Sequence, residues 1–397
     1  MGSGQVDAPG FKTDGESWIS YAHWVRDALG LIRSGTPGKI GLFESSVPEP
    51  TAMLAETVLQ AFRNGVPSSY QSVFMRSNSD LVSRLSERYS VPVRHIHCTT
   101  GATSAIQLIY PALLERGDDV LVERPGFDIF ANYAGDAGMN VGFFERKAPD
   151  FGLTMEAVLQ QLGPGTRMVV ISNLHNPSGA QVSEVELARL AEALNARDIY
   201  LLVDEVYRDY QEDAPAGLDL DRHPNVIRIG SLTKIFGMST LRCGWIFAAG
   251  DTMSRLKAHC DRVDFSVSKF SHAVAAEVLA RSADYDTWRQ GYMTAARPVA
   301  EAALRDMASR DLIDISLPLE GCICFPKIRG VEDTVALSRW LIARHGVVVV
   351  PGECFGMAGH VRIGYSLDEA ELRKAFERLA TGLGEYQEKL SDKQRIA

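Results

Sequence analysis

The sequence of 397 residues lacks the features that mark membrane, secreted and nucleic-acid-binding proteins. No apolar run approaches the ~20 residues needed to cross a bilayer, and no block of five or six basic residues occurs. The stretch from Met1 to Asp7 has neither a basic region nor an apolar core, so we expect no signal peptide. With a net charge of −9, we expect a chain that binds neither membranes nor nucleic acids.

Cysteine is sparse and scattered, with six residues spread over the chain: Cys98, Cys243, Cys260, Cys322, Cys324 and Cys354. Only Cys322 and Cys324 lie close together, in a strand-like run that puts both sulfurs on one face. A metal site would need a second pair or clustered histidines, so we expect core packing and no metal. Scattered thiols of this kind indicate the reducing cytoplasm.

Internal repeats and low-complexity segments are absent from the sequence, and its composition is that of a globular protein. Hydrophobic residues make up 46% and charged residues 23%, which is enough apolar surface for a sizeable core. A chain of 397 residues exceeds the size at which single cores stop growing, so we expect two domains.

Strands and helices alternate between Asp80 and Arg242, in the pattern of consecutive βαβ units. Strands are expected at 119–123, 167–172, 199–203 and 225–230, and helices at 103–115 and 185–197. This alternation predicts the α/β class, with a large domain whose mostly parallel sheet is flanked by helices. One more strand is expected at 244–250, after which Asp251 is expected to cap a long helix reaching toward Arg281.

Both chain ends have a different character. An amphipathic helix is expected at 17–33 and another helix from Thr51. Beyond Tyr292, the pattern predicts an α+β unit with these parts: a helix, a strand at 321–328, a helix at 334–345, short strands at 347–350 and 361–365, and a helix from Glu369 ending in a polar tail at 387–397. We predict an N-terminal arm and part of a small domain at 1–60, the large domain at 61–292 and the rest of the small domain at 293–397.

Lys234 follows the strand-like run 225–230, which places its amine at the carboxyl edge of the sheet, where ligands bind in open α/β folds. Ser231 lies three residues before it and Arg242 eight residues after it. A hydroxyl and a guanidinium together suit a phosphate. An amine beside such a clamp is what an enzyme needs to hold pyridoxal phosphate as a Schiff base, although most lysines are simply solvated.

Three further motifs occur beside apolar runs: Thr100-Gly101-Ala102-Thr103-Ser104-Ala105, Asn176-Pro177-Ser178-Gly179 and Asp204-Glu205-Val206-Tyr207. With Lys234, their order and spacing resemble those of the fold-type I pyridoxal-phosphate enzymes, and most of all the class I/II aminotransferases. The resemblance runs from about Ser17 to about Leu379. It implies a homodimeric, pyridoxal 5'-phosphate-dependent enzyme of amino acid metabolism or biosynthesis.

The resemblance assigns catalytic roles to three residues. Lys234 forms the Schiff base and, once freed by substrate, moves a proton. Asp204 pairs with the protonated pyridine nitrogen, which makes the ring a better electron sink. Tyr207, together with Asn176, donates a hydrogen bond to the phenolic oxygen of the cofactor.

Further cofactor contacts follow from the same resemblance. Gly101, Ala102 and Thr103 open a helix whose N–H groups, with Ser231 and Arg242, would cradle the phosphate. Phe127 is placed over the pyridine ring. Tyr70 resembles the tyrosine that reaches the phosphate of the neighbouring subunit, although Ser77 stands where the family has a glycine.

Arg362 matches the arginine that binds the substrate α-carboxylate as a bidentate fork, near Asn176. The family's substrate loop carries Gly-x-Pro, which here reads Glu44-Ser45-Ser46-Val47-Pro48, with Ser46 in the place of the glycine. This departure marks the substrate pocket as different from the usual one.

Two enzymatic readings remain open. Transamination of an amino acid is the commonest reaction in this family. The alternative is a cyclase or lyase acting on a hydroxylated arginine-like amino acid, because 343–352, 362–366 and the Ser45-Ser46 loop look like the capreomycidine-synthase branch. Glu44 would then pair with a guanidinium group. A third reading, a non-catalytic transcription regulator on the same fold, is opposed by the lack of an added DNA-binding region.

Overall fold

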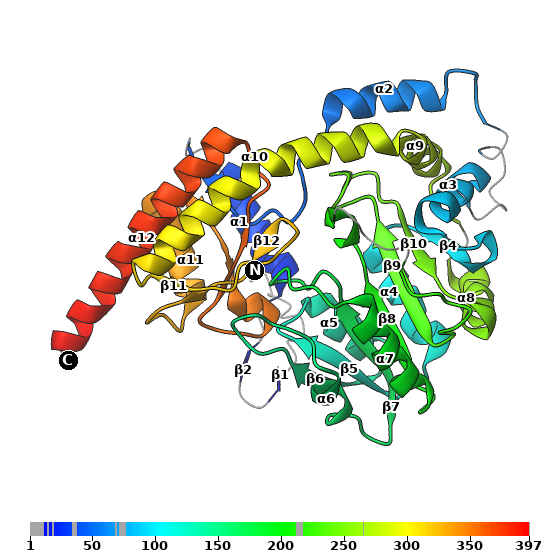
Figure 1. Cartoon of the computed structure of the whole chain (residues 1–397), viewed down its shortest axis with the longest axis horizontal. Coiled ribbons are helices and arrows are strands. Elements are labelled where there is room, and N and C mark those ends of the chain that lie inside the picture. The colour runs from blue at the N-terminus through cyan, green and yellow to red at the C-terminus, as the bar shows by residue number, and fades with distance from the viewer. Residues whose placement is uncertain are drawn as a thin grey trace, which may run out of the picture.

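The computed structural model describes residues 12–13, 16–17, 20–33, 38–67, 70, 77–211, 217–264 and 266–396. Its larger part is built around one sheet, and the long helix α10 (Ser282–Ser309) runs from there to a smaller part (Figure 1). Among the described residues, no helix combines the length and apolar character needed to cross a membrane.

The central sheet has seven strands in the order β4-β10-β9-β8-β7-β5-β6. Their bounds are β4 (Ile96–Thr99), β5 (Asp119–Arg124), β6 (Asn140–Glu145), β7 (Thr166–Ser172), β8 (Tyr200–Asp204), β9 (Val226–Ser231) and β10 (Gly244–Phe247). Neighbours from β6 through β9 pair in parallel, and β10 runs antiparallel to both β9 and β4. The predicted α/β class with a mostly parallel sheet is confirmed.

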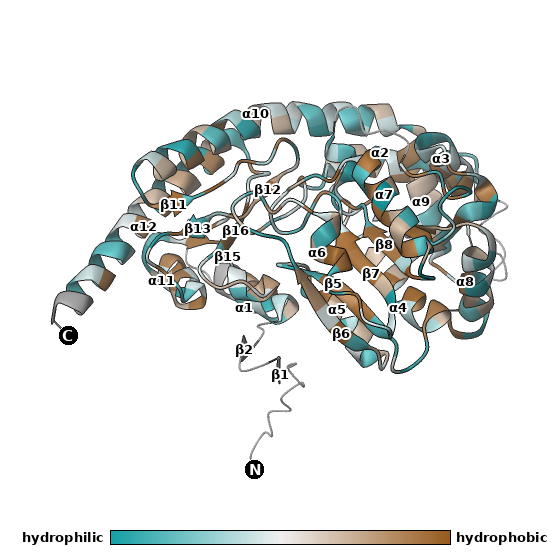
Figure 2. Ribbon diagram, turned by 60° about the horizontal axis from the view of Figure 1, so that its bottom comes forward, coloured by the Kyte–Doolittle hydropathy of each residue, from teal (hydrophilic) through white to brown (hydrophobic). Residues whose placement is uncertain are grey.

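Successive residues of the central strands enter different hydrophobic clusters. Val169 belongs to the cluster that contains Leu187, whereas Val170 belongs to the cluster that contains Ile106. Each strand is therefore covered on both faces, which explains its nearly continuous apolar sequence. The strands β7 and β8 are accordingly brown in Figure 2. The helices of this part are α2 (Thr51–Ala61), α3 (Ser79–Tyr89), α4 (Ala102–Leu113), α5 (Asp128–Asp136), α6 (Met155–Leu159), α7 (Glu184–Asn195), α8 (Gly250–Val263) and α9 (Lys269–Ala280).

The smaller part combines segments from both chain ends. From the beginning come α1 (Tyr21–Arg33) and β3 (Ile40–Gly41), and before them β1 (Lys12–Thr13) and β2 (Glu16–Ser17) pair with each other in a separate two-stranded sheet. From the end come β11 (Ile313–Asp314), β12 (Ile323–Cys324), β13 (Lys327–Ile328), α11 (Thr334–His345), β14 (Val347–Val348), β15 (Val350–Pro351), β16 (Val361–Gly364) and α12 (Glu369–Ile396). Strand β3 pairs in parallel with β14, which joins the two ends. The domain limits at 60 and 292 stay a prediction, and α10 runs across the second one.

The long helix predicted from Asp251 to Arg281 is wrong, because two helices occupy this stretch. Asp264 ends α8 with non-helical backbone angles, and the Ser268 side chain caps α9 by accepting a hydrogen bond from Ser271 N at 3.2 Å. Helix α8 also starts one residue before Asp251, without a side-chain cap.

Three smaller expectations are also corrected. The strand predicted at 321–328 is split into β12 and β13, with Pro326, which has no N–H to donate to a ladder, between them. Helix α1 begins at Tyr21 instead of residue 17. The predicted polar tail continues α12 to Ile396. All six cysteines are buried, as expected of core residues.

Candidate active site

Several of the residues predicted to act in catalysis or cofactor binding lie at or just after the carboxyl ends of parallel strands. Asp204 ends β8, Ser231 ends β9, and Asn176 follows β7 by four residues. Lys234 lies just beyond Ser231, in the turn that leads toward β10. Because parallel strands share one carboxyl edge, these side chains meet on the same side of the sheet.

The Lys234 amine is bound by the loop at 44–48, near the beginning of the chain. Its Nζ donates to Ser45 Oγ at 2.8 Å and lies 5.8 Å from the centre of the Tyr207 ring. Val47 N donates to the Lys234 carbonyl at 3.3 Å, and Tyr210 Oη donates to the same carbonyl at 3.1 Å. The sequence predicted Ser46 in this loop as a substrate contact, which stays a prediction, and the structure adds the contact of Ser45 with the lysine.

Burial, and after it the positive charge of Arg362, lower the pKa of Lys234 from 10.5 to about 8. The negative charges of Glu44 and Asp204 act in the opposite direction. Glu44 itself is exposed. A lysine with such a pKa has a substantial neutral fraction near pH 8, as a nucleophile or a proton acceptor requires.

Asp204 is a buried carboxylate beside this amine. Burial raises its pKa to about 7, while a hydrogen bond from Val206 N at 3.1 Å and the charge of Lys234 favour its ionised form. A cation bound next to Asp204 would favour its ionised form and so lower its pKa again.

The Tyr207 hydroxyl is buried and makes no hydrogen bond within the described part of the chain. Burial raises the pKa of Tyr207 far above the usual value for a phenol, while the positive charge of Arg362 and the nearby Ser45 favour its ionised form. A buried hydroxyl without a partner costs free energy, so this donor suits a ligand atom.

A cradle for an anion lies at the start of α4. Gly101 precedes the helix with φ of 87° and provides no side-chain cap, so the first N–H groups stay available. Arg242 Nη2 donates to Thr100 O and to Thr103 Oγ1, both at 3.3 Å. A Cβ on Gly101 would lie 2.5 Å from that nitrogen, so only glycine allows this approach.

Ser231 and Ala102 complete the same region. Ser231 pairs with Gly244 across β9 and β10, and a Cβ on Gly244 would meet the backbone of Gly101 and Ala102. The structure thus brings together all five residues predicted for the phosphate.

Arg362 on β16 is 1% exposed. Its Nη1 donates to Asn176 Oδ1 at 3.0 Å, and its Nη2 donates to Tyr21 Oη at 2.7 Å and to the Phe43 carbonyl at 3.0 Å. The Tyr21 and Phe355 rings flank the guanidinium, with centroids 4.9 and 5.0 Å away. Arg362 and Asn176 therefore meet as predicted, but nothing in the local sequence pointed to Tyr21.

Phe127 and Tyr70 have different surroundings. Phe127 precedes α5, and its ring contacts Tyr21 edge-on at 5.8 Å, which places it beside the Arg362 cluster. Tyr70 is exposed and packs edge-on against Phe62 at 5.9 Å.

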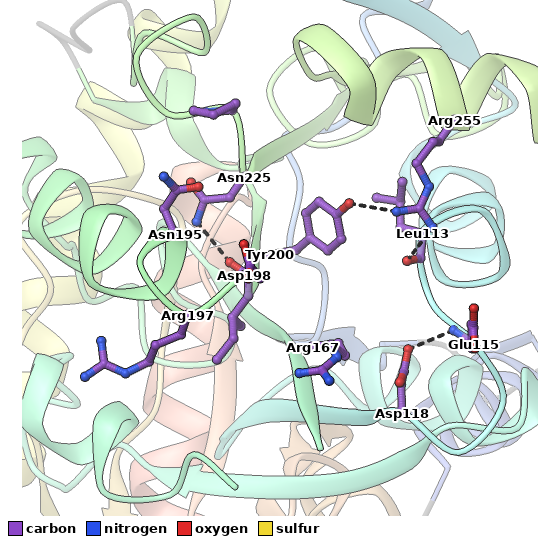
Figure 3. Close-up of a pocket in the computed structure, with 12 residues that line it drawn as sticks. Leu113, Glu115, Asp118, Arg167, Asn195, Arg197, Asp198, Tyr200, Asn225 and Arg255 are labelled. Carbon is purple, nitrogen blue, oxygen red and sulfur yellow. Dashed lines mark hydrogen bonds between the residues drawn. The ribbon is translucent and has the colours of Figure 1, made fainter. Parts of the chain in front are cut away.

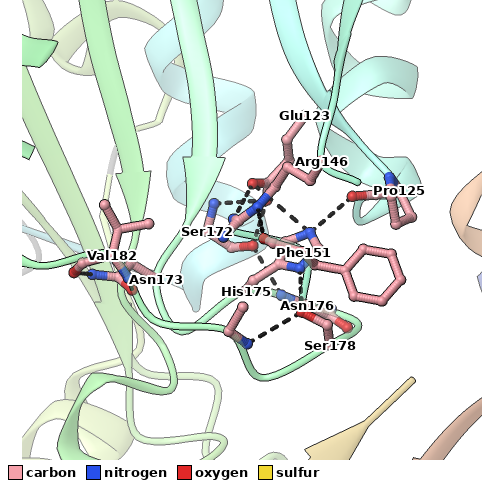
Figure 4. Close-up of polar contacts among 11 residues, drawn as sticks. Glu123, Pro125, Arg146, Phe151, Ser172, Asn173, His175, Asn176, Ser178 and Val182 are labelled. Atoms are coloured by element: carbon pink, nitrogen blue, oxygen red, sulfur yellow. Dashed lines mark hydrogen bonds and ion pairs between the residues drawn. The ribbon is translucent and has the colours of Figure 1, made fainter. Parts of the chain in front are cut away.

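A buried ion pair supports the loop that carries Asn176 (Figure 4). Arg146 Nη1 donates to Glu123 Oε2 at 2.8 Å, with both side chains fully buried. Glu123 Oε1 accepts from the Ser172 hydroxyl at 2.5 Å, and that hydroxyl accepts from Asn176 N at 3.0 Å. This network could not be predicted from the sequence, because single charged residues usually lie at the surface.

His175 belongs to the same network and is a packed residue. Its Nε2 lies 2.8 Å from the Pro125 carbonyl and its Nδ1 2.6 Å from Ser178 Oγ. Burial holds its pKa well below 6.5, so it stays neutral.

A cavity of about 660 Å³ lies at the opposite edge of the sheet, lined by Arg167 and Tyr200 at the amino ends of β7 and β8 (Figure 3). Several of its polar side chains bond one another or the backbone: Arg255 Nη1 donates to Tyr200 Oη at 3.0 Å, and Asn225 Nδ2 donates to the Ile199 carbonyl at 3.0 Å. It contains none of the predicted site residues. No group of three or more potential metal ligands was found in the described ranges.

Comparisons with known proteins agree with this geometry. The family model described as "Aminotransferase class I and II" matches residues 51–379. Capreomycidine synthase of Streptomyces vinaceus is 32% identical over 299 residues, covering 74% of this chain and 75% of that protein. Arginine–pyruvate transaminase of Pseudomonas aeruginosa is 28% identical over 323 residues, covering 77% and 80%. The crystal structure of an archaeal alanine:glyoxylate aminotransferase has the same fold, with a TM-score of 0.82, 22% identity and coverage of 92% and 95%.

The lowered pKa of Lys234 predicts how its reactivity depends on pH. In the cofactor-free protein, an uncharged amine-reactive reagent should label Lys234 half-maximally near pH 8, because burial disfavours the ammonium form of this side chain. Mass spectrometry of the Lys234 peptide over pH 6–11 measures this. A model lysine peptide, with a pKa of about 10.4, is the control, and matching curves for the two would contradict the prediction.

The buried ion pair predicts a stability difference. Arg146→Met should lower the free energy of unfolding by about 3–5 kcal/mol, because Glu123 is left buried without its partner. Arg373→Met removes an exposed pair with Glu369, 2.8 Å apart, and should cost less than about 1 kcal/mol. Urea unfolding compares the two variants, and equal small losses would show that the buried pair is not needed.

Proposed function

The chain belongs to the aminotransferase class I and II family, whose members use pyridoxal 5'-phosphate, and we propose that it transfers the amino group of an amino acid to a keto acid. The observation that carries this proposal is the meeting of Lys234, with its lowered pKa, and Arg362 beside Asn176 in one buried region. An amine that binds the cofactor and a cation that binds a carboxylate are the two groups that the first half of such a reaction requires.

The residues present fit the cofactor. The cradle of Gly101, Thr103 and Arg242 would hold its phosphate, since it offers helix N–H groups and a guanidinium in one place. The buried Tyr207 hydroxyl, without a partner in the described residues, would donate to the phenolic oxygen with Asn176. Ala102, Ser231 and Phe127 would complete the contacts.

Asp204 would face the pyridine nitrogen. Its raised pKa of about 7 shows the cost of an ionised carboxylate there, and a protonated ring nitrogen would offset that cost. When bound, the cofactor would draw electrons from the substrate α-carbon, so that a bond to that carbon can break.

Lys234 would bind the cofactor covalently and, when displaced by substrate, would hold or move a proton at Nζ. Its pKa of about 8 keeps enough neutral amine for that task near physiological pH. The Ser45 hydroxyl, 2.8 Å from Nζ, would keep the amine in place between the two roles.

A cyclase or lyase acting on a hydroxylated arginine-like substrate is the second candidate. Its support is the 32% identity with a protein named capreomycidine synthase. Glu44 offers an exposed carboxylate whose charge acts on Lys234, and it could pair with a guanidinium group. Another relative is named arginine–pyruvate transaminase, so an arginine-like substrate is also compatible with transamination. Ser46, two residues after Glu44, stays a predicted substrate contact.

We propose that the protein is a homodimer in which Tyr70 reaches the phosphate site of the partner subunit. We also propose that it is cytoplasmic. An apolar patch supports the homodimer, formed by the exposed side chains of Leu59, Val66, Tyr70 and Phe270 and by the partly buried Phe62, on and near α2 and α9. The Phe62 and Phe270 rings stack at 5.4 Å, and Leu59 is 74% exposed. Helices α2 and α9 lie side by side at the outer end of the larger part (Figure 1). Such a patch marks a contact surface.

A single half-reaction distinguishes the two candidate reactions. In a transaminase, arginine or another accepted amino acid, given without a keto acid, should convert the cofactor to its pyridoxamine form and release one keto acid per site. Absorbance and mass spectrometry follow both products. Lys234→Ala is the control and should do neither.

Steady turnover of hydroxyarginine without a keto acid, and without accumulation of the pyridoxamine form, would contradict transamination and support the cyclase. Failure of Lys234→Ala to lose covalent attachment of the cofactor would contradict the assignment of Lys234 itself.

The homodimer predicts a sedimentation mass of about twice 43.5 kDa. Leu59→Glu should shift the protein toward monomers, because it places a charge in the apolar patch. Leu319, 80% exposed and outside the patch, provides the control variant Leu319→Glu, which should stay dimeric. A fully active monomer of the parent protein would rule out the shared site.

A further inference from the structure

The guanidinium of Arg362 has few donors left for a substrate. An arginine has five N–H groups, one on Nε and two on each terminal nitrogen. One Nη1 hydrogen goes to Asn176 Oδ1, and the two Nη2 hydrogens go to Tyr21 Oη and the Phe43 carbonyl. Within the described residues, the buried Nε has no partner.

A carboxylate bound at two points needs two parallel N–H groups. The guanidinium offers two such pairs, Nη1 with Nη2 at its end and Nε with Nη2 at its side. Both pairs include Nη2, whose hydrogens are already committed to Tyr21 and Phe43. A two-point grip on a substrate therefore requires one of these two acceptors to leave.

Of the two acceptors, the Phe43 carbonyl is the harder one to move. It belongs to the backbone next to Leu42, whose N donates to Val348 O at 2.8 Å and whose carbonyl accepts from Gly364 N at 2.9 Å. Tyr21 contributes a side-chain oxygen that no strand pairing holds, so a change of the side-chain torsion angle χ1 can remove it from Arg362. Tyr21 is thus the acceptor that an incoming carboxylate would displace.

The position of Tyr21 is built by several parts of the molecule. Its backbone N donates to Asp128 Oδ2 on α5 at 3.0 Å. Its ring contacts Phe127 at 5.8 Å and Phe355 of η4 (Gly352–Phe355) at 5.9 Å. The backbone bond to Asp128 and the two ring contacts therefore place Tyr21 beside Arg362, a residue 341 positions later in the chain, while the hydroxyl itself is bound by Arg362.

We propose that the Tyr21 hydroxyl occupies the carboxylate position of the substrate site, and that a substrate α-carboxylate binds by displacing it from Arg362 Nη2. This inference depends on the role proposed for Arg362. It makes Tyr21, at the start of α1, a residue that sets the affinity of the enzyme for carboxylates.

The test compares Tyr21→Phe with the parent holoenzyme, using propionate as the probe and calorimetry to measure its Kd. The variant keeps the ring and the bond to Asp128 but removes the competing hydroxyl. Propionate should bind about three- to tenfold more tightly, the effect of losing one competing hydrogen bond. Tyr200→Phe, which also removes a tyrosine–arginine bond, of 3.0 Å to Arg255, should leave the Kd unchanged.

Weaker binding in Tyr21→Phe would mean that the hydroxyl itself donates to the carboxylate, and this would overturn the proposal. An unchanged Kd would overturn it as well. Competition between propionate and the amino acid substrate in the parent enzyme tests the role of Arg362 separately. If competition is observed and the Kd is unchanged, the proposed function stands and only the role of Tyr21 fails.

Discussion

The burial of the Arg362 guanidinium is the constraint on which the rest of the site depends. A charged group that is 1% exposed must find hydrogen-bond partners, because an unpaired buried charge is very costly. Its partners come from two regions: Asn176 from the loop after β7, and Tyr21 and Phe43 from the beginning of the chain. The arginine itself comes from β16 near the end. One buried cation thus holds both chain ends against the carboxyl edge of the sheet.

The same burial sets the chemistry of the neighbouring groups. Desolvation disfavours whichever form is charged, so it lowers the pKa of Lys234 to about 8 and raises that of Asp204 to about 7. The two groups, which would differ by more than six pKa units in water, come within about one unit of each other. Both shifts bring the pKa of a buried group closer to neutral pH, which is typical of groups in catalytic sites.

Much of this arrangement could be predicted from the sequence, because it rests on local patterns. Apolar runs predicted the central strands, and the residues after them predicted the meeting of Asp204, Lys234 and Arg242 at one edge. The break between α8 and α9 was missed because it depends on the backbone at Asp264 and the cap at Ser268. The contact of Ser45 with Lys234 was not predicted, because no local pattern shows which side chain of the loop faces the lysine. No local pattern relates Tyr21 to Arg362.

The ion pair of Glu123 and Arg146 shows why a fold keeps charges in its core. Replacing such a pair with apolar residues of similar size is often neutral for stability, so stability alone does not explain it. Its geometry does, because Glu123 fixes the Ser172 hydroxyl, and that hydroxyl accepts from Asn176 N. The Asn176 side chain then meets Arg362. An apolar core could fill the same volume, but it could not aim Asn176, because packing gives no preferred direction to a hydrogen bond. The pair therefore serves the site through orientation.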